Sequence, residues 1–231
     1  MKITAVIPVR KGSQRVNDKN LRAFAGMSLL EVKIKSLLQV PELDTIIVNT
    51  NSEEAIALVE SRFACTKVCA QRREEYYASS KCSGSEFFRH LGEVTNTDLF
   101  IYVPCTSPFV LPETISKCIA KYLEKCNNGD FDCVATVSSV KEFLWLNGKP
   151  INYDPQHAPN SQDLPDVVAL NFGATVVSRE SLIKNSNIIG KKPYFVLTTD
   201  VEAIDIDTPL DFYVAEQLYV KLSAGKGLLA D

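Results

Sequence analysis

Apolar runs alternate with amphipathic stretches along the chain. Ile3 to Val9 and Leu99 to Val103 are near-continuous apolar runs, as expected of central parallel strands that are buried on both faces. Ser28 to Val40 places apolar residues at helical spacing and ends before a proline, which predicts a helix. Ser52 precedes two glutamates, a pattern that predicts a capped helix reaching about Phe63.

The remaining elements continue this alternation. Further strands are expected at 45–50, 66–69, 132–140, 174–178 and 194–197, and further helices at 85–92, 112–126 and 209–222. This order predicts an α/β fold with a doubly wound, mostly parallel sheet in a Rossmann-like three-layer arrangement. A single domain, 1–231, is expected. From about 143 to 165 the apolar periodicity lapses, which predicts a small insertion or dimerisation arm.

Composition and charge narrow the functional classes. The hydrophobic share is 45%, the charged share 23% and the net charge −3 over 231 residues, ordinary values for a globular domain. A pI near 5.6 disfavours nucleic acid as a partner, and no segment reaches the roughly 18 uninterrupted apolar residues of a membrane span. Because the N-terminus is interpreted as a first strand, we expect a cytoplasmic protein with no membrane partner.

The cysteines and histidines offer little for a zinc site. The seven cysteines include no C-x-x-C, and His90 and His157 are far apart in sequence, whereas zinc ligands usually come as closely spaced pairs. Free, buried thiols are therefore expected.

A basic loop follows the first predicted strand. Four cations and one glycine lie between Arg10 and Asn20, at the sheet edge where doubly wound folds bind ligands. Glycine lets the backbone approach an anion, and Arg or Lys neutralises phosphate oxygens. Neither G-x-G-x-x-G nor the Walker A pattern is present. The loop is therefore a candidate anion site of another type, and the alternative is an ordinary solvated loop with scattered charge.

An acidic pair lies near the C-terminus. Asp205 and Asp207 alternate with Ile204 and Ile206, which predicts an apolar strand with both carboxylates on one side. Paired carboxylates repel each other unless a cation lies between them, and Mg²⁺ suits such a pair when phosphates complete its ligands. The alternative is capping of the following helix by Asp207 and Thr208, with Asp205 simply solvated.

These motifs resemble those of the acylneuraminate (CMP-sialic acid) cytidylyltransferase family. The run I-P-V-R-K-G-S-Q-R-V-N-D-K-N, residues 7–20, resembles the family's nucleotide-binding loop, hydrophobic-P-A-R-x-G-S-K-R-hydrophobic-x-x-K-N. The other similar segments are G-M-S-L-L at 26–30, I-V-N-T-N at 47–51, T-S-P at 106–108, Q-D-L-P at 162–165 and D-I-D-T-P-L-D at 205–211. The resemblance covers nearly the whole chain and implies a fold like that of the nucleotide-diphospho-sugar transferases.

The resemblance also implies roles for individual residues. It implies that Arg10 and Lys19 offset charge on the phosphates of CTP, and that Asp205 and Asp207 hold Mg²⁺; these four are the candidate catalytic residues. The candidate nucleotide-binding residues are Arg10, Gly12, Ser13, Gln14, Arg15, Lys19, Asn20 and Arg72. The candidate acceptor-binding residues are Thr106, Ser107, Gln162 and Asn171.

The departures from the family pattern cluster on the acceptor side. Pro104 stands where the family has a glutamine that meets the sugar, and Val110 and Ser161 stand where it has arginines. A third family arginine is replaced by Ala169 or Leu170. Because arginines suit the carboxylate of a nine-carbon acid sugar, their loss argues against ordinary sialic acid. A modified ulosonic acid and another acid, such as a phosphonate, both remain open.

The leading hypothesis is a Mg²⁺-dependent, homodimeric cytidylyltransferase that joins CMP from CTP to an acidic acceptor and releases pyrophosphate. A non-catalytic nucleotide-binding relative is the alternative, and the intact basic loop and acidic pair argue against it. An NAD(P)-dependent oxidoreductase is disfavoured because the glycine fingerprint is missing.

Overall fold

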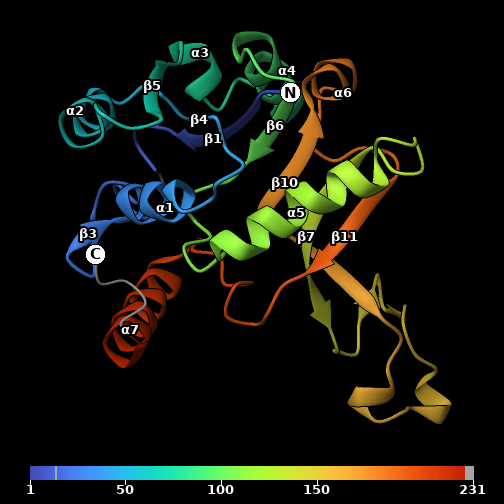
Figure 1. Ribbon diagram of the computed structural model, residues 1–231. Helices are drawn as coiled ribbons and strands as arrows, with labels where there is room; N and C mark the ends of the chain where they lie inside the picture. Colours follow the sequence, from blue (N-terminus) through green and yellow to red (C-terminus); the bar gives the residue numbers. More distant parts are fainter. Residues whose placement is uncertain (14, 227–231) are drawn as a thin grey trace.

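A seven-stranded sheet forms the centre of the computed structural model, which describes residues 1–13 and 15–226 (Figure 1). The strand order is β11-β7-β10-β6-β1-β4-β5, and β10 alone among these strands runs antiparallel to its neighbours. Their bounds are β1 (Ile3–Val9), β4 (Thr45–Thr50), β5 (Val68–Arg72), β6 (Leu99–Tyr102), β7 (Cys133–Val140), β10 (Val167–Ser178) and β11 (Pro193–Leu197). The predicted doubly wound, mostly parallel α/β fold is confirmed.

Helices cover both faces of the sheet. Their bounds are α1 (Leu29–Leu38), α2 (Glu53–Arg62), α3 (Glu75–Ala78), α4 (Gly84–Val94), α5 (Pro112–Lys125), α6 (Arg179–Asn185) and α7 (Pro209–Lys226). The larger core lies under α1, α2, α5 and α7, and the smaller core lies under α4 and α6. Along β1, Ile3, Ala5 and Ile7 enter the larger core and Val6 enters the smaller one, because side chains alternate along a strand.

The predicted helix starts at Ser28 and Ser52 are confirmed. Ser28 forms a capping box with Glu31, and the Ser52 hydroxyl accepts the Ala55 N–H, so each serine satisfies a free N–H of the first turn.

Two sequence expectations about strands are wrong. The third strand begins at Val68 rather than at Thr66, because the Thr66 hydroxyl donates to Phe63 O at 2.7 Å and holds the preceding turn. The segment 204–207 is not a strand. Its Ile206 N–H bonds to Thr106 O, in the loop after β6, at 2.9 Å, so the segment joins the sheet edge by a single backbone contact instead of a ladder.

The C-terminal helix packs on a small hairpin that follows the basic loop. This hairpin is β2 (Ala23–Phe24) and β3 (Met27–Ser28). Phe24 is fully buried and contacts the rings of Phe212 and Tyr219 edge-on, with centroids 5.5 and 5.2 Å away. Ala25 N–H also donates to Glu216 at 2.9 Å. The C-terminal helix is therefore tied to the hairpin that follows the basic loop.

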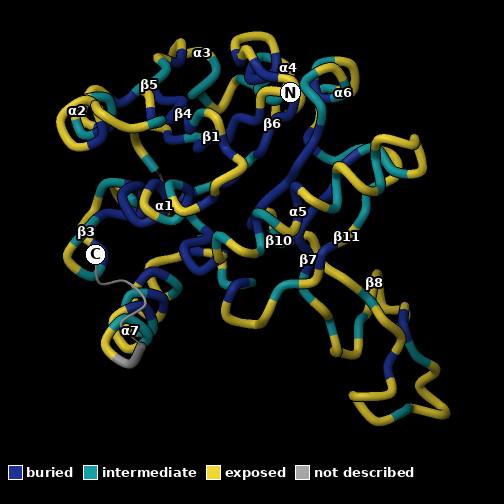
Figure 2. Tube along the Cα trace, viewed as in Figure 1, coloured by how far each residue is buried: buried dark blue, intermediate teal, exposed yellow. Residues whose placement is uncertain are grey.

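A small arm projects from the sheet between β7 and β10 (Figure 1). It contains the hairpin β8 (Trp145–Leu146) and β9 (Lys149–Pro150), followed by 3-10 turns at Pro155–His157 and Ser161–Asp163. The hairpin turns at Asn147-Gly148, both with positive φ, the sequence pair that such tight turns favour. Most of the arm is exposed (Figure 2).

All seven cysteines are free, as expected, but their burial differs. Cys105, Cys118 and Cys133 are buried, whereas Cys65 and Cys69 are exposed. The expectation of buried thiols is therefore wrong for Cys65, which precedes the edge strand β5, and for Cys69, which lies in it. Over residues 1–13 and 15–226, no helix has the length and apolar character needed to cross a bilayer.

Lys33 is a fully buried cation on α1. Its ammonium donates to Ser107 O at 2.6 Å, and no carboxylate pairs with it among the described residues. Burial lowers the pKa of Lys33 to about 8, because an ammonium loses its hydration in the core. The protein therefore carries an energetic cost at this position at neutral pH.

We expect Lys33→Met to stabilise the protein at pH 7 by about 1–3 kcal/mol, since each unit of pKa shift corresponds to about 1.4 kcal/mol and the lost hydrogen bond offsets part of the gain. The lowered pKa means that the unfolded chain binds the Lys33 proton more tightly, so native stability recovers as pH rises from about 8 towards 10.5. Urea unfolding at pH 7 and pH 10 measures both effects. The advantage of the variant should shrink at pH 10; a constant gap, or one that Lys35→Met on the exposed side of α1 reproduces, would contradict this account.

Candidate active site

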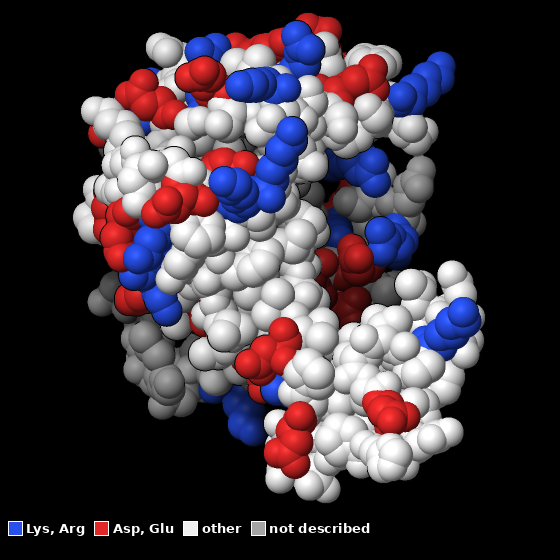
Figure 3. All heavy atoms as spheres, turned by 90° about the vertical axis from the view of Figure 1, so that its right-hand side faces the viewer, with Lys and Arg blue, Asp and Glu red and all other residues white. Residues whose placement is uncertain are grey.

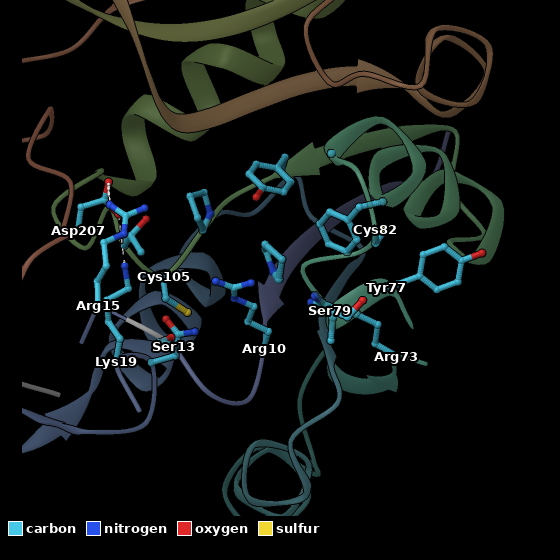
Figure 4. Close-up of a pocket in the computed structure, with 18 of the residues that line it drawn as sticks. Arg10, Ser13, Arg15, Lys19, Arg73, Tyr77, Ser79, Cys82, Cys105 and Asp207 are labelled. Atoms are coloured by element: carbon cyan, nitrogen blue, oxygen red, sulfur yellow. Dashed lines mark ion pairs between the residues drawn. The ribbon is translucent and has the colours of Figure 1, made fainter. Parts of the chain in front are cut away.

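A cavity of about 450 Å³ opens at the edge of the sheet where β1 and β6 end (Figure 4). Three loops line it: the basic loop after β1, the loop 73–84 after β5, and the segment 104–106 after β6. Asp207 completes the lining from the C-terminal part of the chain. The cavity therefore lies at the carboxyl ends of the strands, where the sequence predicts the ligand site.

The basic loop supplies one wall of the cavity. Arg10, Ser13, Arg15, Lys19 and Asn20 all line it. Gly12 lies outside the lining and turns the chain with φ +73°, a conformation that glycine adopts without strain. The predicted nucleotide contact Gln14 lies outside the described residues.

Asp207 meets two cations of this loop. Its carboxylate lies 3.0 Å from an Arg15 Nη1 and 3.6 Å from Lys19 Nζ, and Figure 4 shows all three side chains converging. Lys19 Nζ also donates to Ile206 O at 2.5 Å. The contacts of Lys19 join the basic loop to the acidic segment. They bring the sequence-predicted residues Arg15, Lys19 and Asp207 together.

The hydrogen bonds at the start of α7 test whether Asp207 caps this helix. The carboxylate that caps α7 belongs to Asp211, which accepts the N–H groups of Thr208 and Asp207 at 2.7 and 3.1 Å. The Thr208 hydroxyl accepts Asp211 N–H at 3.2 Å. These contacts leave the Asp207 carboxylate directed to the cavity rather than to the helix end.

Asp205 lies beside Asp207 but outside the cavity lining. Partial burial and the Asp207 carboxylate raise the pKa of Asp205, while a hydrogen bond with Thr106 and the Lys19 cation act in the opposite direction. Two oxygen-donor side chains next to a basic cavity fit a hard divalent cation that takes its other ligands from phosphates and water. The described residues contain no cluster of three or more metal-ligating side chains.

The structure brings Arg73, rather than the predicted Arg72, into the cavity. Arg72 pairs with Glu53 at the surface. Arg73 is 5% exposed; its Nη2 donates to Val9 O and Asn49 O, and its Nε donates to the Asn49 side chain. Burial lowers the pKa of Arg73 to about 10, which still leaves it charged near neutral pH. The two adjacent arginines predicted a basic contact in this segment, but the sequence did not indicate which of them faces the cavity.

Aromatic residues form the opposite wall. Tyr77 lines the cavity and stacks on His90, with ring centroids 3.5 Å apart and planes 7° from parallel. Burial lowers the pKa of His90, which favours a neutral ring. Phe87 and Tyr102 also line the cavity. Sequence reasoning missed these aromatic side chains, because in an apolar strand or a helical stripe they look like core residues.

The four candidate acceptor residues are not brought together. Thr106 lines the cavity, but Ser107 is buried outside it. Gln162 is exposed on the arm. The Asn171 amide is engaged inside the sheet, where its oxygen accepts from the Thr136 hydroxyl and Gly173 N–H, and its nitrogen donates to Thr198.

The sheet and the basic cavity at its edge define a nucleotidyltransferase-like α/β protein. The cytidylyltransferase family model matches residues 4–183, so the chain belongs to the cytidylyltransferase family. This confirms the family resemblance read from the sequence motifs.

Two curated relatives show the range of the family around this chain. The N-acylneuraminate cytidylyltransferase of Escherichia coli O18:K1:H7 is 25% identical over 97% of this chain and 54% of its own length. The CMP-N,N′-diacetyllegionaminic acid synthase of Legionella pneumophila is 28% identical over 94% of this chain and 96% of its own length. The chain spans about half the length of the N-acylneuraminate cytidylyltransferases from E. coli, Danio rerio and Oncorhynchus mykiss.

A solved structure gives the same fold. A CMP:2-keto-3-deoxy-manno-octonic acid synthetase complexed with CTP superposes with a TM-score of 0.69, covering 96% of this chain and 100% of its own, at 16% sequence identity. This likeness is one of fold.

Proposed function

We propose that this protein transfers CMP from CTP to an acidic sugar and releases pyrophosphate, with Mg²⁺ as its metal. The observation that carries the proposal is the meeting of the basic loop with Asp207 at the sheet edge, through Arg15 and Lys19. A triphosphate needs cations around its oxygens, and its metal needs carboxylates beside them. Family membership and the names of the relatives support cytidine as the nucleoside.

The basic loop would bind the triphosphate. Arg10, Arg15 and Lys19 supply three cations to the cavity, and Ser13 and Asn20 supply neutral polar groups. The Lys19 side chain is only 13% exposed and is held by Ile206 O, so its charge is already in place before the substrate arrives. Such fixed charge stabilises a phosphoryl transition state without reorganisation.

Asp205 and Asp207 would hold Mg²⁺. When bound there, the metal would neutralise phosphate charge and favour departure of pyrophosphate. Thr106 and Lys19 bond to Ile206, which lies between the two carboxylates in the sequence, and so hold the segment in place. Asp207 lines the cavity, and Asp205 lies next to it outside the lining.

The acceptor would be an acid of the ulosonic type, as the names of the relatives suggest. A phosphonate is the alternative acid, and no contact among the described residues that line the cavity favours it. The replaced family arginines and the engaged Asn171 amide support an acceptor other than ordinary sialic acid.

A pyrophosphate-release assay with CTP, Mg²⁺ and a panel of acids tests the activity. The panel contains N-acetylneuraminic, N,N′-diacetyllegionaminic and pseudaminic acids and a phosphonate. We expect turnover of at least one acid, abolished by a chelator, and slow turnover of N-acetylneuraminic acid. If CTP binds but no acid of the panel leads to release of pyrophosphate, the result would instead support a non-catalytic nucleotide-binding protein.

Asp207→Asn should lower the rate of the best acid by about 10²–10³-fold, the typical cost of losing a group that stabilises transition-state charge. Asp200→Asn is the control, because Asp200 is exposed and lies outside the cavity. Full Mg²⁺-dependent activity of Asp207→Asn would overturn the metal assignment.

Arg73→Lys should weaken CTP binding by roughly tenfold or more, because lysine cannot reproduce the fixed fork that holds Val9 O, at the start of the basic loop, and Asn49. Arg72→Lys should leave CTP affinity within about twofold, since an exposed ion pair contributes little. Calorimetric titration of both variants with CTP, after a thermal unfolding check, measures the difference. Equal losses in the two variants would contradict the assignment of Arg73.

We also propose that the protein is a homodimer through the arm and the adjoining sheet face. Leu170, Val137 and Leu197 form one row across β10, β7 and β11, so their side chains share a face. Leu170, Leu197 and Phe195 on that face are 38%, 59% and 43% exposed. Figure 3 shows a hollow between the body of the molecule and the arm, with acidic and basic side chains inside it. An apolar sheet face that continues onto a projecting arm supports a second copy as its cover.

Leu197→Asp should convert the dimer to a monomer, because a charge would have to be buried without a partner. Light scattering coupled to gel filtration measures the mass of the wild type and the variant. Val220→Asp, at an exposed apolar position of α7, should remain dimeric. A monomeric wild type would overturn this interface.

A further inference from the structure

Tyr102 is the last residue of β6 and lines the cavity. Its neighbours Ile101 and Val103 enter the larger core, whereas Tyr102 packs against the smaller core on the opposite face. Its ring meets Phe88 edge-on, with centroids 5.6 Å apart and planes at 81°. Packing therefore fixes the direction of the phenol before any ligand binds.

The Tyr102 hydroxyl has no hydrogen-bond partner within residues 1–13 and 15–226. The side chain is half-buried, so its ring is packed while its hydroxyl is accessible from the cavity. Burial raises the pKa of Tyr102 to about 12, so the group is a neutral O–H donor at physiological pH. An uncommitted donor in a cavity indicates that the ligand supplies the acceptor atom.

Tyr102 lies on the strand that joins the two charged parts of the site. It pairs with Val6 of β1, the strand that leads into the basic loop, and Thr106, four residues further on, bonds to Ile206 of the acidic segment. The phosphates of a nucleotide are met by the cations of the basic loop. A neutral donor near Asp205 is suited to the second substrate, whose attacking oxygen must approach the phosphate beside the acidic pair.

Other groups at this end of β6 do not offer the same donor. Pro104 has neither a side-chain donor nor a backbone N–H, and the Thr106 hydroxyl interacts with Asp205. Ser107 lies outside the cavity. Among the residues of this strand end that line the cavity, Tyr102 therefore carries the hydroxyl that has no partner within residues 1–13 and 15–226.

We propose that the Tyr102 hydroxyl recognises the acid acceptor by donating a hydrogen bond to one of its oxygen atoms, and so helps to set acceptor specificity. This inference rests on the proposed cytidylyl transfer. It makes Tyr102 a specificity-determining residue, distinct from the residues that hold CTP and the metal.

Tyr102→Phe removes the hydroxyl and keeps the ring. We expect the Kd and KM for the best acid of the panel to rise roughly three- to tenfold, the effect of one lost neutral hydrogen bond, while the Kd for CTP stays within about twofold. Tyr76→Phe is the matched control: Tyr76 lies outside the cavity and its hydroxyl donates to Glu86. Calorimetry gives both Kd values, and steady-state kinetics give KM and kcat.

The outcomes separate this inference from the proposed function. If the wild type binds an acid but does not turn it over, the proposed cytidylyl transfer is overturned. A higher Kd for that acid in Tyr102→Phe would still support recognition by Tyr102. An unchanged acid Kd, or an equal loss of CTP affinity, would overturn the role of Tyr102. Failure of every acid to bind the wild type would overturn both.

Discussion

The contact of Lys19 with Ile206 and Asp207 is the constraint on which the site depends. It joins a loop that follows the first strand to a segment nearly two hundred residues later, and both halves of the site meet there. Neither half is complete without the other, because the loop supplies cations to the cavity and the segment supplies carboxylates. The sheet places the basic loop at the carboxyl ends of its strands, and the contacts of Lys19 hold the acidic segment next to that loop.

Much of the fold follows from the sequence for a simple reason. Strands such as β1 and β6 are buried on both faces, so their apolar runs are unambiguous, and Ser28 and Ser52 mark helix starts by chemistry that acts locally. The segment 204–207 has a similar alternating pattern but forms no strand. Its conformation is set by Thr106 and Lys19, which lie far away in sequence, and no local pattern records such contacts.

In the candidate site, too, some features follow from local sequence patterns and others depend on contacts between distant residues. The basic loop and Asp207 meet as the motifs suggested, since both lie at the carboxyl edge that the topology fixes. The choice between Arg72 and Arg73 depends on the exact end of β5, where one residue of shift reverses which side chain faces inward. Tyr102 was hidden for another reason: in an apolar run, a tyrosine looks like packing until its hydroxyl is seen without a partner.

The packing of α7 on the hairpin after the basic loop has a consequence for how the chain divides. The family model ends at residue 183, yet Phe212 and Tyr219 pack on Phe24 and the acidic segment lies between these regions. A fragment cut at the family boundary would keep the cations and lose both the carboxylates and the brace behind them. The part of the chain that builds the candidate site therefore extends beyond the region that the family model matches, because residues 205–219 supply its carboxylates and the packing behind the basic loop.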